Sequence, residues 1–150
     1  MKFITVILLL VSVYAKAQIN WISFDELPEL MRKEPKKVFI FLETDWCKFC
    51  KMMKLTTFED TAVINQLNKD YYCLRFNAES KEEVTLLGKK YAYNTSGEYA
   101  GKHQLAVFLG KANNQLQFPT SVFLDTQFQL HLRLSIYLSP KDFLEILGNS

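Results

Sequence analysis

Residues 38–51 read VFIFLETDWCKFCK, and the fold that we expect is built around this segment. It opens with an unbroken apolar run, 38–42, which has the length and pattern of a strand buried on both faces of a sheet. Cys47 and Cys50 follow after a short polar link, and a helix is predicted from Cys47 to Leu55. A buried strand that leads directly into a helix is a basic unit of α/β folds.

The remainder of the chain continues to alternate between strand and helix patterns. Strands are predicted at 19–22, 71–76, 121–124 and 129–136, and the last two are expected to form a hairpin. Helices are predicted at 25–33 (where Ser23 and Glu26 make a capping box), after Asp60, and at 81–91, 103–109 and 141–147. This order predicts one α/β domain with a mixed central β-sheet flanked by helices.

The bulk composition is that of an ordinary globular domain. The 150 residues are 49% hydrophobic and 14% aromatic, which is enough to cover both faces of a sheet. The formal charge is only +2 and no run of five like charges occurs, so the sequence argues against a nucleic-acid partner. Partners are therefore not expected to be selected by net charge.

The N-terminus, residues 1–17, has the layout of a secretory signal peptide. Lys2 precedes an apolar stretch from Phe3 to Tyr14, and residues 15–17 (Ala-Lys-Ala) supply the small side chains that signal peptidase requires. The stretch is shorter than the roughly 20 residues that cross a bilayer as a helix. We therefore expect residues 18–150 to form a periplasmic or secreted domain without stable membrane insertion. An uncleaved N-terminal anchor and a buried first strand are the alternatives.

Export to an oxidising compartment changes how the cysteines are interpreted. A small domain stapled by disulfides shows a larger, even set, whereas this chain has the close pair Cys47 and Cys50 and a single Cys73. At a helix start, unpaired backbone N–H groups and the charges of Lys48 and Lys51 favour a Cys47 thiolate. Cys50, one turn further on, can then resolve a mixed disulfide. The pattern predicts a redox-active pair in which Cys47 is the attacking and more exposed sulfur.

Two other uses of the pair remain open. Half of a zinc site would need further ligands, but His103 and His131 are isolated and Cys73 lies inside an apolar strand. A static structural disulfide also fits the spacing, although so short a loop constrains the unfolded chain only modestly. We expect no metal and no cofactor. We expect Cys73 to be a buried, inert thiol and His103 to cap a helix or lie at the surface.

Two segments resemble the thioredoxin-like superfamily. Trp46-Cys47-x-x-Cys50, after the strand VFIFLETD, is similar to the thioredoxin active-site segment, and FPTSVFLD at 118–125 is similar to the family's cis-proline strand. The order of elements also matches over almost all of the mature chain. The two segments look most like those of secreted bacterial thioredoxin fold domain proteins of the thiol:disulfide interchange type. The resemblance implies a three-layer sandwich for residues 18–150.

The resemblance also assigns roles to residues around the pair. It implies that Pro119 is cis and stands beside the two cysteines, where the backbone before it can pair with an extended substrate. It further implies that Trp46 flanks the substrate groove and that Phe118 and Thr120 line it.

The sequence departs from thioredoxins proper in three places. Lys48-Phe49 stands where thioredoxins carry Gly-Pro, and Phe41 stands where they bury an aspartate that helps to deprotonate the resolving cysteine. Glu43 and Asp45 are candidates to replace that aspartate, and the alternative for Asp45 is a solvated acid of the loop. The third departure is a long segment, 92–116, which shapes the groove, docks a partner or is a simple family insertion.

The resemblance implies an exported thiol–disulfide oxidoreductase that acts on disulfide-containing exported proteins, with reduction favoured over oxidation or isomerisation. A reductase in an oxidising compartment needs electrons, so a membrane thiol protein is the expected electron donor. The alternative is a non-catalytic thioredoxin-like binding module that uses residues 92–116 to hold a partner.

Overall fold

The computed structural model describes residues 17–149, so the predicted signal segment lies outside the described residues except for Ala17. The helices are α1 (Leu27–Lys33), α2 (Lys48–Leu55), α3 (Thr61–Asp70), α4 (Gln104–Gly110) and α5 (Pro140–Gly148), with a 3₁₀ turn η1 (Thr57–Glu59). The strands are β1 (Lys37–Glu43), β2 (Tyr71–Asn77), β3 (Val84–Leu86), β4 (Lys89–Tyr91), β5 (Thr120–Leu124) and β6 (Leu130–Leu134).

The central sheet contains β2, β1, β5 and β6 in that order. β1 is parallel to β2 and antiparallel to β5, and β5 and β6 form the predicted hairpin. The sheet is therefore mixed. The predicted α/β class, with helices on both sides of a mixed central sheet, is confirmed.

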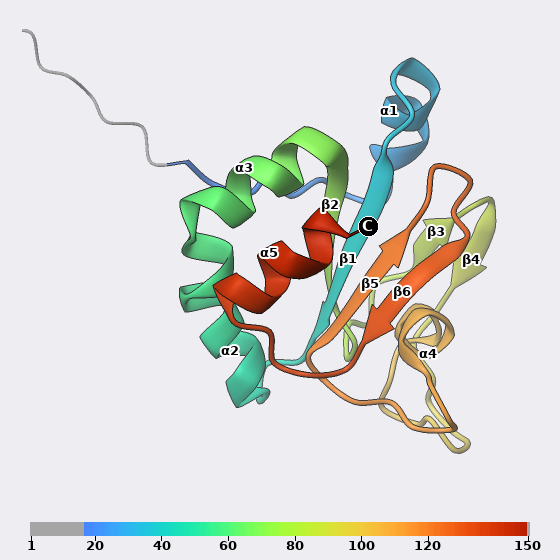
Figure 1. Cartoon of the computed structure of the whole chain (residues 1–150). Helices are drawn as coiled ribbons and strands as arrows, with labels where there is room; N and C mark the ends of the chain where they lie inside the picture. The colour runs from blue at the N-terminus through green and yellow to red at the C-terminus, as the bar shows by residue number, and fades with distance from the viewer. Residues whose placement is uncertain (1–16, 150) are drawn as a thin grey trace, which may run out of the picture.

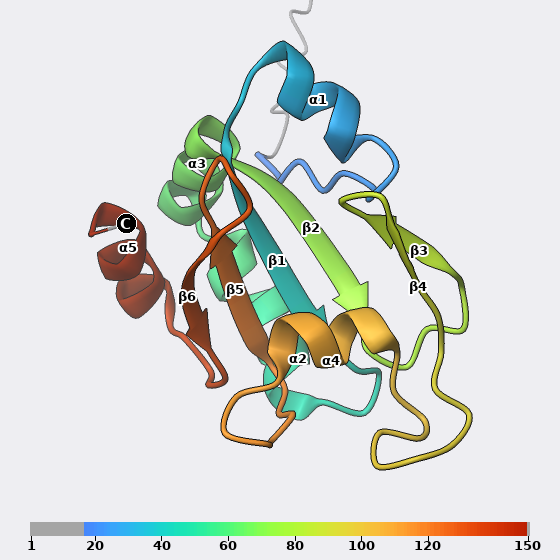
Figure 2. The same ribbon diagram turned by 90° about the vertical axis from the view of Figure 1, so that its right-hand side faces the viewer.

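β1 separates the two hydrophobic layers, and its central residues are 0% exposed. Successive side chains of a strand point to opposite faces, so Phe39 and Phe41 pack toward α2, α3 and α5. Val38, Ile40 and Leu42 pack toward α1, α4 and the β3–β4 hairpin. Figures 1 and 2 show these two groups of elements on opposite sides of the sheet. The apolar run of the sequence is thus the middle of a three-layer sandwich.

The predicted helix at 81–91 is wrong, because this segment forms the two-stranded hairpin β3–β4. Leu87 and Gly88 connect the strands with φ values of 53° and 74°. Such a pair of left-handed residues makes the two-residue turn whose twist suits a hairpin. Leu86 and Tyr91 face the core, whereas Leu87, which a helix would have buried, is 61% exposed.

The other differences from the sequence prediction are one missing strand and small shifts of element ends. Residues 19–22 do not form a strand, and Trp21 makes only an isolated bridge to Cys73. α1 begins two residues later than expected, although the N–H of Ser23 donates to Glu26 Oε2 at 2.7 Å as a capping box requires. Within residues 17–149, no helix has the length and apolar character needed to span a bilayer.

Candidate active site

The loop after β1 places the cysteine pair at the N-terminus of α2. Cys47 is the N-cap residue, and its N–H donates to the carbonyl oxygen of Thr44 at 3.2 Å. The helix begins at Lys48, so Cys50 lies in its first turn. Cys47 and Cys50 form a disulfide with a Cα–Cα distance of 5.2 Å. The prediction that a buried strand leads into a helix at Cys47 is confirmed.

The two sulfurs have different surroundings. Cys47 Sγ accepts a hydrogen bond from the backbone N–H of Cys50 at 3.1 Å. After reduction, the same N–H and the positive end of the helix dipole favour a thiolate at Cys47. Cys47 is 3% exposed and Cys50 is 0% exposed, so Cys47 is the sulfur that a substrate can reach first.

β5 begins directly after a proline that lies at the same end of the sheet. Thr120 pairs with Leu42, which places Pro119 next to the point where β1 leads into the cysteine loop. The Phe118–Pro119 peptide bond is cis. Phe118 packs against the hydrophobic cluster that contains both cysteines. We expected Thr120 to line the substrate groove. Instead, its side chain is fully buried and hydrogen-bonded inside the protein, so it does not line an open groove.

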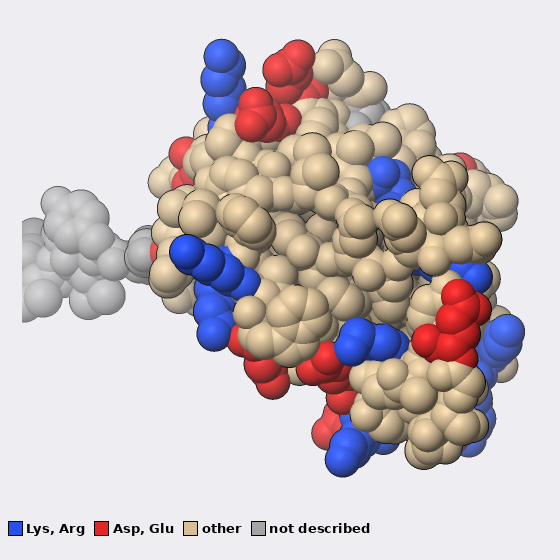
Figure 3. Space-filling view, turned by 90° about the horizontal axis from the view of Figure 1, so that it is seen from below, with Lys and Arg blue, Asp and Glu red and all other residues tan. Residues whose placement is uncertain are grey.

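Aromatic side chains border the pair, and we call Trp46, Phe49, Phe118 and Tyr137 the aromatic rim. Trp46 is 63% exposed and its ring centroid lies 6.4 Å from that of Phe118. Phe49, between the cysteines, is 53% exposed and lies 6.3 Å from Tyr137. Figure 3 views the molecule from the end where α2 and α4 lie, and much of this face carries no charged side chain. Such a surface suits contact with a polypeptide.

Glu43 is the acidic residue directed toward α2. It follows Phe41 by two residues on β1 and therefore shares the face that packs against the cysteine helix. Its carboxylate forms an ion pair with Lys54, and its side chain is 13% exposed. Lys54 lies four residues after Cys50, so both project from the same side of α2. The pair Glu43–Lys54 thus lies on the side of the helix that carries Cys50.

Asp45 and Lys48 lie on the outer side of the cysteine loop. Asp45 is exposed, and its Oδ1 accepts a hydrogen bond from the side-chain amide of Asn77 at 3.1 Å. Lys48 is exposed and has no ion pair among residues 17–149. Of the two acids that the sequence offers in place of the missing aspartate, Glu43 is the one on the face of β1 that packs against α2.

Two residues near the pair carried no signal in the sequence. Glu79 accepts a hydrogen bond from the indole N–H of Trp46 at 3.0 Å. Tyr137 contacts Phe49 and lies with its hydroxyl 3.4 Å from Thr56 Oγ1, at the end of α2. Both come from distant parts of the chain, so only the folded structure brings them to the site.

Cys73 and His103 lie away from the cysteine pair and have structural roles. Cys73 pairs with Phe39 inside the sheet, and burial raises the pKa of its thiol to about 12. The prediction that it is a buried thiol is confirmed. His103 is the N-cap of α4, as expected, and its Nδ1 accepts the N–H of Leu105 at 3.1 Å. It is fully buried, and this burial lowers the pKa of the imidazole.

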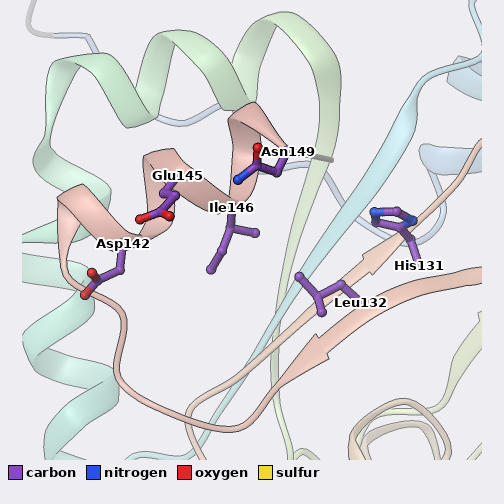
Figure 4. Close-up of a pocket in the computed structure, with 6 residues that line it drawn as sticks. All are labelled: His131, Leu132, Asp142, Glu145, Ile146 and Asn149. Carbon is purple, nitrogen blue, oxygen red and sulfur yellow. The ribbon is translucent and has the colours of Figure 1, made fainter.

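An open cleft between β6 and α5 offers no alternative site. His131, Leu132, Asp142, Glu145, Ile146 and Asn149 line it. Figure 4 shows Asp142 and Glu145 on α5, Asn149 at the end of that helix and His131 on β6, and these side chains do not converge on one point. Asp142 is already engaged, because it accepts a hydrogen bond from Ser139 at 2.6 Å. Across residues 17–149, no group of three or more His, Cys, Asp or Glu side chains is placed to hold a metal ion.

The fold and the cysteine pair together define a thioredoxin-like protein of the thiol–disulfide exchange class. The family model of the thioredoxin-like domain matches residues 24–150, and the chain therefore belongs to the thioredoxin-like domain family. No curated protein matches the sequence.

Solved structures share this fold at low sequence identity. The oxidoreductase DsbH is 16% identical with a TM-score of 0.61, over 90% of this chain and 85% of that one. A thioredoxin from Thermus thermophilus is 18% identical with a TM-score of 0.61, over 88% and 86%. A putative disulphide-isomerase from Bacteroides thetaiotaomicron is 23% identical with a TM-score of 0.57, over 88% and 93%. At these identities the likeness concerns the fold.

Proposed function

We propose that this protein is an exported thiol–disulfide oxidoreductase that reduces disulfides of extracytoplasmic proteins through Cys47-Lys48-Phe49-Cys50. One observation carries the proposal: Cys47 is the N-cap of α2, and its sulfur accepts the N–H of Cys50 at 3.1 Å. A thiolate at this position is stabilised by the helix that also carries its resolving partner. The names of the structural neighbours, which include an oxidoreductase and a disulphide-isomerase, support the same chemistry.

In the first step, the Cys47 thiolate of the reduced protein attacks one sulfur of a substrate disulfide. The substrate S–S bond breaks, a Cys47–substrate mixed disulfide forms, and the other substrate sulfur leaves as a thiolate that takes up a proton. The aromatic rim holds the substrate chain during this step. Because Cys50 is fully buried, its sulfur cannot reach the substrate disulfide in place of Cys47.

In the second step, Cys50 attacks Cys47 Sγ. The Cys50 thiol gives its proton to Glu43, the Cys47–Cys50 disulfide forms, and the second substrate sulfur leaves as a thiolate and is protonated. Two electrons have then passed from the cysteine pair to the substrate. The structure holds the oxidised product of this step, the Cys47–Cys50 disulfide. A dithiol donor must return two electrons for another turnover, and a membrane thiol protein is the proposed source.

Reduction of insulin in the presence of a dithiol donor tests the activity. The wild-type protein is expected to accelerate insulin reduction, and Cys47→Ser is expected to abolish the acceleration. Cys73→Ser is the matched control, because Cys73 is a free thiol buried in the sheet. Equal rates for the wild type and Cys47→Ser would show that the pair is inert.

The export proposal rests on the signal-like layout of residues 1–17. Expression of the whole chain in a bacterium, followed by mass spectrometry of the periplasmic fraction, tests it. A mature protein that begins at Gln18 is expected. Retention of Met1 on protein in the cytoplasm would contradict export.

A further inference from the structure

One carboxylate oxygen connects the cysteine loop to the segment 92–116. Glu79 Oε1 accepts the indole N–H of Trp46 at 3.0 Å and also the ammonium of Lys102 at 2.6 Å. Glu79 and Lys102 are both largely shielded, with side chains 31% and 26% exposed. Lys102 therefore touches the same atom that anchors Trp46.

The backbone fixes the position of Lys102. Its carbonyl oxygen accepts the N–H of Asn94 at 3.0 Å, and its own N–H donates to the carbonyl of Tyr99 at 3.0 Å. The N–H of Gly101 donates to Asn94 at 2.9 Å, and the left-handed φ of 84° at Gly101 allows this loop to close. The ammonium group of Lys102 is thus held by a loop that is closed by backbone hydrogen bonds.

The next residue, His103, holds both ends of the loop that carries Glu79. Its backbone N–H donates to the carbonyl of Ala78 at 2.7 Å. Its ring Nδ1 accepts the N–H of Leu105, so Nε2 carries the proton and donates to the carbonyl of Glu82 at 2.9 Å. We call residues 92–116 the inserted segment. Its residue His103 therefore holds residues 78–82 by hydrogen bonds at both ends, at Ala78 and at Glu82.

From this arrangement we infer that the inserted segment is a positioning element for the redox site: Lys102 holds Glu79, and Glu79 fixes the indole of Trp46 as one wall of the substrate groove. The inference deepens the proposed function and rests on it for the meaning of the groove. The indole of Trp46 is mostly exposed. Without the hydrogen bond to Glu79 it would have to lose conformational freedom each time a polypeptide binds, and this entropy cost weakens binding. The inserted segment thus acts on polypeptide substrates at a distance from the sulfurs.

The ionisation of Glu79 agrees with the geometry. The hydrogen bond from Lys102, and next that from Trp46, lower the pKa of the Glu79 carboxyl. The carboxylate is therefore charged at neutral pH and accepts both hydrogen bonds. A charged acceptor makes the stronger kind of hydrogen bond.

Lys102→Met and Glu79→Ala test the inference, with Lys102→Arg as the conservative variant. Lys90→Met is the matched control, because Lys90 donates to Glu83 at 2.9 Å in the same kind of pair on β4. The first readout is the indole N–H resonance of Trp46 in a ¹H–¹⁵N spectrum of the oxidised protein, assigned with Trp46→Phe. The second readout is the KM and kcat for insulin and for a small aromatic disulfide.

Lys102→Met and Glu79→Ala are expected to shift the Trp46 resonance, whereas Lys102→Arg and Lys90→Met leave it near the wild-type position. For insulin, KM is expected to rise about three- to ten-fold with kcat nearly unchanged, as loss of one ordered contact predicts. The small disulfide is expected to react at wild-type rates. If Lys102→Met does not fold, Glu79→Ala and Lys102→Arg carry the test.

An unchanged Trp46 resonance in both Lys102→Met and Glu79→Ala would overturn the inference. So would an equal rise of KM in Lys90→Met. If the wild type reduces neither substrate, the proposed function fails, but the resonance still decides whether Lys102 positions Trp46.

Discussion

Replacement of Glu43 by glutamine is expected to slow the resolving step and leave the first attack intact. Glutamine keeps the size of the side chain but cannot accept the proton of Cys50. Glu43 lies on the face of β1 that packs against α2, and its partner Lys54 projects from the side of the helix that carries Cys50. No other acid of the cysteine loop has this placement, since Asp45 is exposed and bonded to Asn77.

The size of the effect follows from the surroundings of Glu43. A positioned general base contributes about 10²- to 10⁴-fold to a rate. The carboxylate is also engaged in the ion pair with Lys54, which places the expected loss at the lower end of this range. We expect about 10²-fold, or about 2.7 kcal/mol in the barrier of the second step. With a side chain only 13% exposed, little water is available to replace the base.

A single-turnover experiment separates the two steps. Reduced protein is mixed with a peptide disulfide, quenched with acid and analysed by mass spectrometry. The Cys47–peptide mixed disulfide is expected to accumulate in Glu43→Gln, while the first peptide thiol is released at the wild-type rate. Asp45→Asn is the control and should resolve as fast as the wild type. The reasoning is refuted if the mixed disulfide decays equally fast in Glu43→Gln, or if Asp45→Asn is the slower variant.

Two further predictions concern buried titratable groups. Burial raises the pKa of Cys73 to about 12, so iodoacetamide at pH 8 should modify it only after unfolding; labelling of the native protein would contradict this. Burial lowers the pKa of His103 below the ordinary value of 6.5, so its contribution to stability is full above that pH and is lost as the pH falls below it. Urea unfolding between pH 5 and 7 should therefore show a weaker pH dependence in His103→Gln than in the wild type. Equal slopes in the wild type and His103→Gln would refute the second prediction.

The middle of the fold could be predicted because its pattern is local. The apolar run 38–42 is long enough to identify a buried strand, and the pair Cys47 and Cys50 directly follows it. The hairpin β3–β4 could not be predicted in the same way. Its strands have three residues each, too few to show alternation, and Val84, Leu87 and Tyr91 happen to fit a helical period.

The surroundings of the pair depend on contacts between distant segments. Glu79 is 33 residues from Trp46, and Tyr137 is 81 residues from Thr56. No spacing rule connects such positions, so the anchoring of Trp46 and the position of Tyr137 required the folded chain. Glu43 and Asp45 were equivalent acids in the sequence. The alternation of side chains along β1 and the position of Lys54 distinguish them.

The most direct test of the account is the acidity of the Cys47 thiol. The rate of its alkylation by iodoacetamide is followed against pH in the reduced protein, with the modified peptide identified by mass spectrometry. We predict a pKa of the Cys47 thiol well below the value of about 8.5 for a free cysteine, because the thiolate accepts the N–H of Cys50 at the start of α2. A midpoint at or above that value, or a Cys47 that cannot be alkylated in the folded protein, would contradict it.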